Sequence, residues 1–253
     1  MSGKPEVILS AQSLRKSFRG FTVLNDVSLD VRRGTIHSLI GPNGAGKTTF
    51  FNVVTRFLDP SGGRIFFNGI DITTAGAAHV ARLGMVRSFQ ISAVFHNLTV
   101  LENVRVALQR KRTDDLHFWS SCRVLDGLND RARSLLALVG LEGFAETPAM
   151  ELSYGRRRAL EIATTLALDP ELLLLDEPTS GMGHEDIERT ASLIRQVARE
   201  RTVVMVEHNL SVVADLSDRI TVLARGEIVA DGDYASVSKD PAVIEAYLGT
   251  DDD

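Results

Sequence analysis

The sequence predicts an α/β protein whose main sheet is parallel, and three observations support this prediction. In the last third of the chain, two continuous apolar runs bracket the helical pattern of residues 184–200, an alternation typical of a parallel sheet covered on both faces. Earlier, the apolar run 35–40 leads through a glycine-rich loop into a second helical pattern at 48–58. Between these parts, residues 99–165 repeat apolar residues at a spacing of three and four, which predicts helices.

The first 70 residues predict strands, because short apolar or alternating runs are separated there by Gly, Asn and Asp. These strands are expected at residues 6–14, 21–31, 35–40 and 63–69. The middle of the chain predicts helices at 98–112 and 130–141, and the polar and aromatic residues 113–123 between them receive no assignment. The last third predicts strands at 171–178 and 201–208, followed by a hairpin over 218–232 that turns near Arg225 and Gly226.

The composition is that of a globular protein, with 44% apolar and 24% charged residues among 253. The net charge of −5 gives no general reason to expect a nucleic-acid partner. Cys122 is the only cysteine, which excludes an internal disulfide framework and fits a reducing cytosol. The chain has no apolar run of about 18 residues and no secretory pattern in residues 1–10, so we expect any membrane contact to go through a partner.

Residues 41–49, GPNGAGKTT, match the phosphate-binding pattern G-x-x-x-x-G-K-[ST]. The match lies between an expected strand and an expected helix, as such a loop requires, and a chance match in a chain of this length is on the order of 1%. The glycines let backbone N–H groups close around phosphate oxygens, Lys47 supplies a positive charge and Thr48 an oxygen for Mg²⁺. The predicted nucleotide site comprises Gly41, Pro42, Asn43, Gly44, Ala45, Gly46, Lys47, Thr48 and Thr49.

Three polar residues follow the other two apolar strands. Asp176 and Glu177 end one run and His208 ends the other. Each residue type alone is more often a plain strand end or a cap, but ligands of open α/β sheets gather at the carboxyl ends of strands. Beside a phosphate loop, Asp176 is therefore expected to hold Mg²⁺ through water and Glu177 to orient or deprotonate the attacking water. His208 is expected to hydrogen-bond the γ-phosphate and that water.

A second anion site is suggested by LSYG, residues 152–155, directly ahead of a helical pattern. First-turn N–H groups lack partners, so Ser153 and Gly155 suit an anion, although for an isolated LSYG a simple N-cap at Ser153 is the favoured interpretation. Gln90 lies at the boundary between the part of the sequence that predicts strands and the part that predicts helices. Phe18 is an aromatic residue that either belongs to the core or stacks on a nucleotide base.

The order of these segments resembles the ATP-binding subunit of ABC transporters over essentially the full length of the chain. The matching segments are the adenine-stacking aromatic Phe18, the phosphate loop, the glutamine-loop residue Gln90, the signature LSYGRRR, LLLLDEP with Asp176 and Glu177, and the switch histidine His208. The resemblance implies a P-loop NTPase core with an antiparallel β subdomain and an inserted α-helical subdomain, together one ABC ATPase domain. The core would comprise residues 1–90 and 166–253, the helical subdomain 91–165, and a disordered tail 250–253.

The resemblance also implies a homodimer or heterodimer with a second ABC ATPase subunit, bound head to tail. Ser153 and Gly155 of one subunit would then cap the γ-phosphate held by the loop of the other. ATP and Mg²⁺ are the implied cofactors, with Mg²⁺ held through Thr48, Gln90 and Asp176, and with Lys47, Glu177 and His208 as catalytic residues. Implied partners are integral membrane permease subunits and, indirectly, a periplasmic or extracellular solute-binding protein, but no nucleic acid. The location implied is the cytoplasmic face of the membrane, as a peripheral subunit.

Finer features resemble one branch of the family. RSFQ, LSYG, VEHN and the terminal IEAYLG are similar to the branched-chain amino-acid uptake branch, whose relatives also import other polar amides and amino acids. A lipopolysaccharide-export ATPase shares a similar size and a YLG ending, so export is an alternative. A soluble ABC ATPase acting on ribosomes or DNA is another, but that class normally has two cassettes per chain or a long coiled-coil insertion.

Three positions depart from the family pattern. Arg156 stands where Gln or Glu is usual, and its cation is expected either beside the capped phosphate or pointing elsewhere. Gly183 replaces a common Asp or Asn, which weakens any argument for coupling through that side chain, and Phe18 replaces a frequent Tyr without loss of stacking. None of these changes removes a group that hydrolysis requires.

Overall fold

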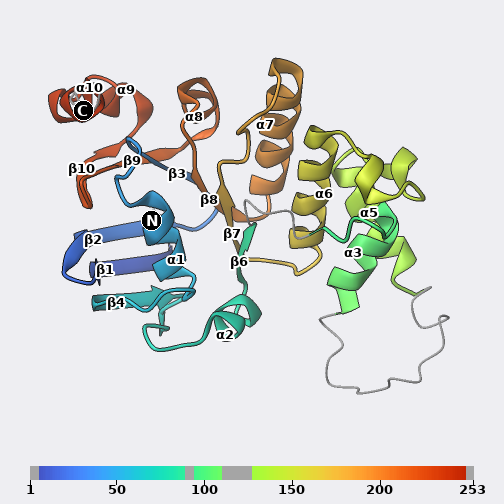
Figure 1. Ribbon diagram of the computed structural model, residues 1–253, viewed down its shortest axis with the longest axis horizontal. Coiled ribbons are helices and arrows are strands. Elements are labelled where there is room, and N and C mark those ends of the chain that lie inside the picture. The colour runs from blue at the N-terminus through green and yellow to red at the C-terminus, as the bar shows by residue number, and fades with distance from the viewer. Residues whose placement is uncertain (1–5, 89–93, 110–126, 249–253) are drawn as a thin grey trace, which may run out of the picture.

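The computed structural model describes residues 6–88, 94–109 and 127–248. These residues form two sheets and a set of helices (Figure 1). Some sequence-based interpretations concern residues outside the described ranges: Gln90, the end of the predicted helix 98–112, the segment 113–123 with Cys122, and the tail 250–253.

The smaller sheet is antiparallel, in the order β2-β1-β4-β5. Its strands are β1 (Val7–Phe18), β2 (Phe21–Arg32), β4 (Gly62–Phe67) and β5 (Ile70–Asp71). The first strand runs four residues beyond the predicted end at 14, to Phe18, because pairing with β2 keeps the polar residues after Leu14 extended. The two strands are joined at Arg19 and Gly20, whose positive φ values of 48° and 90° suit the tight turn of a hairpin.

The larger sheet has the order β10-β9-β3-β8-β7-β6. All neighbouring strands are parallel except β9 and β10, which form the hairpin predicted at Arg225 and Gly226. The two turn residues have φ values of 50° and 80°. The strands are β3 (Ile36–Ile40), β6 (Met85–Ser88), β7 (Leu172–Asp176), β8 (Thr202–Val206), β9 (Arg219–Ala224) and β10 (Glu227–Gly232). Every residue of β3, β7 and β8 is buried, which explains their continuous apolar runs.

The strand that precedes His208 is shorter than predicted. It ends at Val206, two residues before the histidine, because the last ladder partner of β8 is Asp176, the end of β7. The chain then turns, so His208 is an exposed loop residue and the preceding Glu207 is fully buried.

The helices cover the parallel sheet and extend to one side of it (Figure 1). α1 follows the phosphate loop, α6 and α7 precede and follow β7, and α3 and α5 pack beyond α6. The bounds are α1 (Lys47–Val54), α2 (Ala77–Arg82), α3 (Val100–Gln109), α5 (Asn129–Leu138), η2 (Glu142–Phe144), η3 (Ala149–Glu151), α6 (Tyr154–Leu166), α7 (His184–Ala198), α8 (Leu210–Leu216), α9 (Tyr234–Val237) and α10 (Pro241–Leu248).

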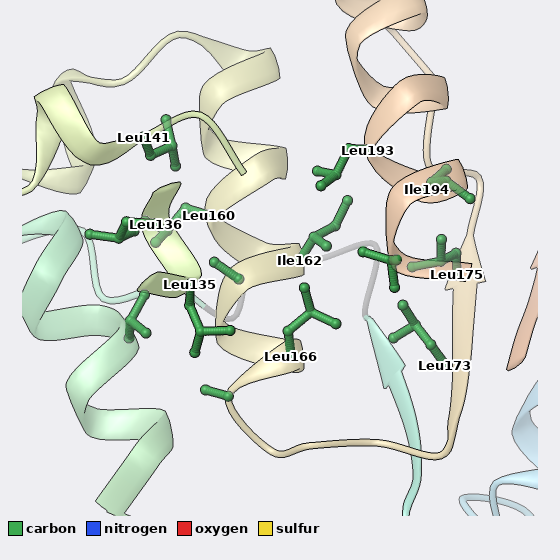
Figure 2. Packing of buried hydrophobic residues seen from close by; sticks show 14 of the residues in the cluster. Leu135, Leu136, Leu141, Leu160, Ile162, Leu166, Leu173, Leu175, Leu193 and Ile194 are labelled. Carbon is green, nitrogen blue, oxygen red and sulfur yellow. The ribbon is translucent and has the colours of Figure 1, made fainter. Parts of the chain in front are cut away.

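One hydrophobic core joins the helical region to the sheet. Leu160 and Leu166 of α6 belong to the same cluster as Leu136 of α5 and Leu173 of β7 (Figure 2). A helix apolar on two sides is expected when it packs between two layers. The division of the chain at residues 90/91 and 165/166 stays a prediction, and the second of these boundaries falls in the last turn of α6.

Within the described ranges, no helix combines the length and the apolar character that a membrane-spanning helix needs.

A buried histidine makes stability depend on pH. His37 lies in β3 with 1% of its surface exposed, and its Nε2 is 2.8 Å from Thr221 Oγ1. Burial lowers the pKa of His37 to about 4, with a smaller opposing effect from Asp231. The folded state therefore prefers the neutral ring, so its stabilising contribution is complete above the unfolded pKa of about 6.5 and declines as pH falls toward 4.

His37→Gln is expected to reduce this acid sensitivity. Protonation of the wild-type ring costs about 2 to 3 kcal/mol of unfolding free energy between pH 7 and 4, which the variant cannot lose. Urea unfolding at several pH values measures how steeply the free energy of unfolding changes with pH. The exposed His79→Gln is the matched control and should keep the wild-type slope, and equal slopes for the two variants would contradict the assignment.

Candidate functional site

The phosphate loop connects β3 to α1, which begins at Lys47. At two positions of this loop, neighbouring backbone leaves no room for a side chain, so the residue there must be glycine. A Cβ at Gly41, where φ is 149°, would lie 1.9 Å from the Leu223 carbonyl oxygen of β9. A Cβ at Gly46, where φ is 104°, would lie 3.0 Å from the Val23 carbonyl oxygen of β2. The loop therefore lies against both sheets, and its glycines are required by conformation and by space.

The Lys47 ammonium lies inside this loop. Its Nζ donates to the carbonyl oxygens of Gly41 at 2.6 Å and Pro42 at 2.9 Å. Burial lowers the pKa of Lys47, and the charges of Glu177 and Asp176 act in the opposite direction. The charges of three residues singled out in the sequence thus act on one another, one from the start of α1 and two from the end of β7 and the residue after it.

Asp176 is held by two buried arginines. It is the last residue of β7 and is 1% exposed. Arg87 of β6 donates to its Oδ2, and Arg158 of α6 donates to its backbone oxygen at 2.6 Å. Arg87 also donates to Asn52 Oδ1 of α1 at 2.6 Å, so this arginine joins three elements around the site. Sequence reasoning missed Arg87, because a single basic residue in a short strand gives no distinguishing pattern.

The second carboxylate oxygen of Asp176 tests whether a metal ion fits. Asp176 Oδ1 is buried and has no hydrogen-bond partner in the described part of the chain. An acceptor in this condition suits a cation or a metal-bound water. The same ranges contain no group of three His, Cys, Asp or Glu side chains placed to hold a metal. This donor set fits Mg²⁺, which binds few protein ligands and keeps waters and phosphate oxygens.

The turns after β7 and β8 are tied together by Glu207. Thr179 Oγ1 donates to Glu207 Oε1 at 2.9 Å, and the His208 and Asn209 N–H groups donate to the same oxygen at 3.3 and 3.2 Å. Glu177, with a positive φ of 45°, donates its own N–H to Val206 O at 2.9 Å. The structure thereby brings Glu177 and His208 to one edge of the sheet. The sequence analysis did not single out Glu207, although an acidic residue directly after a continuous apolar run was a pattern that could have indicated it.

Phe18 lies at the exposed end of the β1–β2 hairpin. Its side chain is 42% exposed, and Lys16 Nζ lies 4.9 Å from the ring centroid. The hairpin's second strand contacts the phosphate loop, since Val23 and Leu24 are the neighbours of Gly46. Phe18 is therefore a surface ring on the element next to the loop and is not part of the core.

Ser153 and Gly155 belong to the N-terminal end of α6, a helix that Figure 1 shows apart from α1. Ser153 is the N-cap of α6, and its side chain accepts from the Arg156 N–H at 3.5 Å. A Cβ at Gly155 would lie 2.6 Å from Asp186 Cγ of α7, so α6 and α7 approach closely there. The Arg156 guanidinium lies 4.2 Å from the Phe144 ring centroid. Within the chain the Arg156 cation therefore faces an aromatic ring, and its place relative to a phosphate held by a second subunit stays a prediction.

Loss of the buried ion pair is expected to destabilise the fold. Arg87→Met leaves the Asp176 carboxylate buried without its cation, which costs about 3 to 5 kcal/mol of unfolding free energy. Urea unfolding measures this cost. In the matched control Arg195→Met, the lost partner Asp215 is exposed, so a change below about 1 kcal/mol is expected. An equal loss of unfolding free energy in the two variants would contradict the claim that burial makes the Arg87–Asp176 ion pair costly to break.

The fold and the loop define a nucleotide-binding P-loop protein. Two family descriptions match the sequence: ABC transporter over residues 24–180, and branched-chain amino acid ATP-binding cassette transporter over residues 227–253. The chain is 36% identical over 249 residues to the high-affinity branched-chain amino acid transport ATP-binding protein LivG of Salmonella typhimurium, with 96% of this chain and 98% of LivG covered.

Solved structures agree. An ATP-binding cassette of an ABC transporter in its ADP conformation superposes with a TM-score of 0.84 at 28% identity, covering 96% of this chain and 99% of that one. A dimeric ATP-binding cassette in a post-hydrolysis state with ADP and Pi has a TM-score of 0.75 at 25% identity, covering 89% and 98%.

The chain belongs to the ABC transporter family, as an ATP-binding subunit. The predictions of an α/β ABC ATPase fold and of ATPase activity are confirmed by this membership. The similarity to LivG agrees with the prediction of an importer motor.

Proposed function

We propose that this chain is the ATP-hydrolysing subunit of an importer for branched-chain amino acids or related small amides. The observation that supports it most is the gathering of Lys47, Asp176 and Glu177 at one sheet edge, in a chain similar to LivG over nearly its whole length. The groups needed to bind phosphates, hold a metal and activate water come from three strand ends that share that edge.

The reaction is transfer of the γ-phosphoryl group to water. The water oxygen forms a bond to the γ-phosphorus, the bond to the β–γ bridging oxygen breaks, and ADP and phosphate result. Glu177 accepts the proton of the attacking water, His208 donates a hydrogen bond to the γ-phosphate, and Lys47 neutralises charge on the β- and γ-phosphates. Thr48 and Asp176 would hold Mg²⁺, with Gln90 as the third proposed ligand, and the ion supplies neutralisation of phosphate charge when bound.

Hydrolysis by this arrangement requires a dimer. Ser153 and Gly155 belong to α6 and its N-cap, whereas the phosphate loop leads into α1, and Figure 1 shows these two helices apart. A structurally similar cassette with ADP and Pi is dimeric. The N-terminal end of α6 would serve the ATP held by a second ABC ATPase subunit, an identical copy or a homologue. Ser153 would then both cap its own helix and contact a phosphate of the other subunit's ATP, so the N-cap and the anion site would be formed by the same residue.

The permease contact would lie on the side of the site formed by α2, α3 and α6. An apolar hollow of about 620 Å³ lies among these helices, lined by Ala81, Val106 and Leu168. Phe57 and Val106, which also line this hollow, are 53% and 38% exposed. An apolar surface of this kind suits a helix of a membrane subunit. The chain would then be peripheral, at the cytoplasmic face of the membrane, and would act indirectly with a solute-binding protein.

Reconstitution tests the proposal. The chain is expected to co-purify with integral permease subunits, and the ATPase rate of the complex in vesicles should rise with a binding protein loaded with leucine, isoleucine or valine. Stimulation by lipopolysaccharide would support export instead, and recovery with ribosomes would support the non-transport class. Stimulation by a polar amino acid or amide would support the assignment as an importer but would change the substrate assigned to it.

A further inference from the structure

Glu207 is a buried acidic residue that the proposed reaction does not use. It directly follows the last residue of β8, and 0% of its surface is exposed. Burying a carboxylate is costly unless hydrogen bonds satisfy its oxygens. Because no part of Glu207 reaches the surface, its side chain contacts neither a nucleotide nor another subunit. Any effect of Glu207 on the reaction must therefore pass through the groups to which it is bonded.

The two oxygens of Glu207 accept hydrogen bonds from two different turns. In the turn after β7, Thr179 donates its Oγ1 hydroxyl to Oε1 at 2.9 Å and its N–H to Oε2 at 3.4 Å. In the turn after β8, the His208 and Asn209 N–H groups donate to Oε1 at 3.3 and 3.2 Å. All four partners are donors, which suits an ionised carboxylate, and hydrogen bonds to an ionised acceptor are the stronger kind. One side chain thus links both turns.

Each of these turns carries a residue of the proposed reaction. Glu177 lies two residues before Thr179, and its N–H donates to Val206 O at 2.9 Å. Val206 directly precedes Glu207, so the backbone bond of Glu177 and the side-chain bond of Thr179 join the two turns at successive residues. His208 directly follows Glu207 and has its N–H bonded to the carboxylate. The links between the turns therefore lie beside both Glu177 and His208.

The turn after β8 is also held from its other side. Asn209 is the N-cap of α8, and its side chain accepts from the Ser211 and Val212 N–H groups at 3.1 and 3.4 Å. The backbone of His208 is thus fixed between the Glu207 carboxylate and the first turn of α8. Its side chain is exposed, so the ring can reach a ligand from a fixed backbone.

We propose that Glu207 is a positioning residue for hydrolysis, which holds the turns of Glu177 and His208 at a fixed separation through Thr179. The inference rests on the proposed function, in which Glu177 and His208 act on the same water and γ-phosphate. A 1 Å misplacement of reacting groups can lower the rate by about 10²-fold. ADP has no γ-phosphate, so its binding does not depend on this separation. Loosening the link therefore lowers kcat and leaves the Kd for MgADP unchanged.

Thr179→Val removes the hydroxyl donor and keeps the shape of the side chain. The kcat for phosphate release by the complex with permease and partner ATPase subunits is expected to fall about 10-fold, as for a partial misplacement. The Kd of the full chain for MgADP, from calorimetric titration, should stay within about twofold of wild type. Thr179→Ser keeps the hydroxyl and should keep kcat near wild type. An unchanged kcat in Thr179→Val, or an equal loss in Thr179→Ser, would overturn the proposal.

Thr202→Val is the matched control, because it removes a buried threonine hydroxyl from the opposite end of the same strand. Thr202 is 1% exposed, and its Oγ1 accepts from the Gly34 N–H at 2.9 Å. The variant should lower the melting temperature as Thr179→Val does and keep wild-type kcat. An equal loss of kcat in Thr202→Val would overturn the proposal by assigning the effect to general stability.

Glu207→Gln tests the carboxylate itself. Gln has the same shape, but in either orientation its NH₂ group faces a backbone N–H of one of the two turns. The kcat should again fall with little change in the Kd for MgADP, and wild-type kcat would overturn the proposal. Failure of the wild-type complex to hydrolyse ATP would defeat the proposed function, whereas an active wild-type complex with unchanged kcat in Thr179→Val and Glu207→Gln defeats this inference alone.

Discussion

Replacing Glu177 by Gln is expected to reduce ATP turnover by about 10²- to 10⁴-fold, the usual contribution of a positioned general base. Glu177 directly follows β7, and its N–H is bonded to Val206 O of β8, so the backbone aims the side chain from a fixed point. Gln has nearly the same shape but cannot accept a proton from water. Steady-state release of phosphate by the permease complex measures the loss.

Binding of ATP by Glu177→Gln should stay within about twofold of wild type, because a general base acts on the water and not on the nucleotide. Sedimentation in MgATP should then show an accumulated dimer with the partner ATPase subunit, since closure is retained and the step that opens it is lost. Glu142→Gln, an exposed substitution of the same chemistry, is the control and should keep full turnover. Wild-type turnover in Glu177→Gln would assign the base to another residue.

Lys47→Ala is expected to weaken nucleotide binding about 10- to 100-fold. A hydrogen bond to a charged group is worth about 1.5 to 3 kcal/mol, and this ammonium faces the phosphates from inside the loop. The variant also leaves the Gly41 and Pro42 carbonyls without the donor that folds the loop around the site. Calorimetric titration with MgADP measures the change in Kd.

The control for this variant is Lys239→Ala, which removes the same charge from an exposed position after α9. Its Kd should equal that of wild type. A large loss in Lys239→Ala would mean that overall charge governs affinity, and an unchanged Kd in Lys47→Ala would refute the assignment of residues 41–49 as the phosphate loop.

The sequence predicted the parts of this protein that are continuous in the chain. The loop 41–49 was recognisable because its glycines, lysine and threonine act within nine consecutive residues. The buried strands β3, β7 and β8 were recognisable because strands covered on both faces are apolar throughout. The hairpin at Arg225 and Gly226 followed from turn chemistry that is also local.

Errors arose where a strand end depends on its partner. β1 continues to Phe18 because β2 lies beside it, and β8 ends at Val206 because β7 ends opposite. Neither partner is visible in the periodicity of the strand itself. The direction of the Arg156 side chain is a similar case, since the Phe144 ring that holds it comes from another element.

The sequence by itself determined the α/β class, the phosphate loop and the family resemblance, because each depends on residue types at short fixed spacing. The tertiary structure alone decided that Arg87 holds Asp176 across 89 residues and that Glu207 ties two loops together. Contacts of this kind depend on strand order, and the order β3-β8-β7-β6 is not the order of the chain. Packing of the whole core selects that order, so no local pattern contains it.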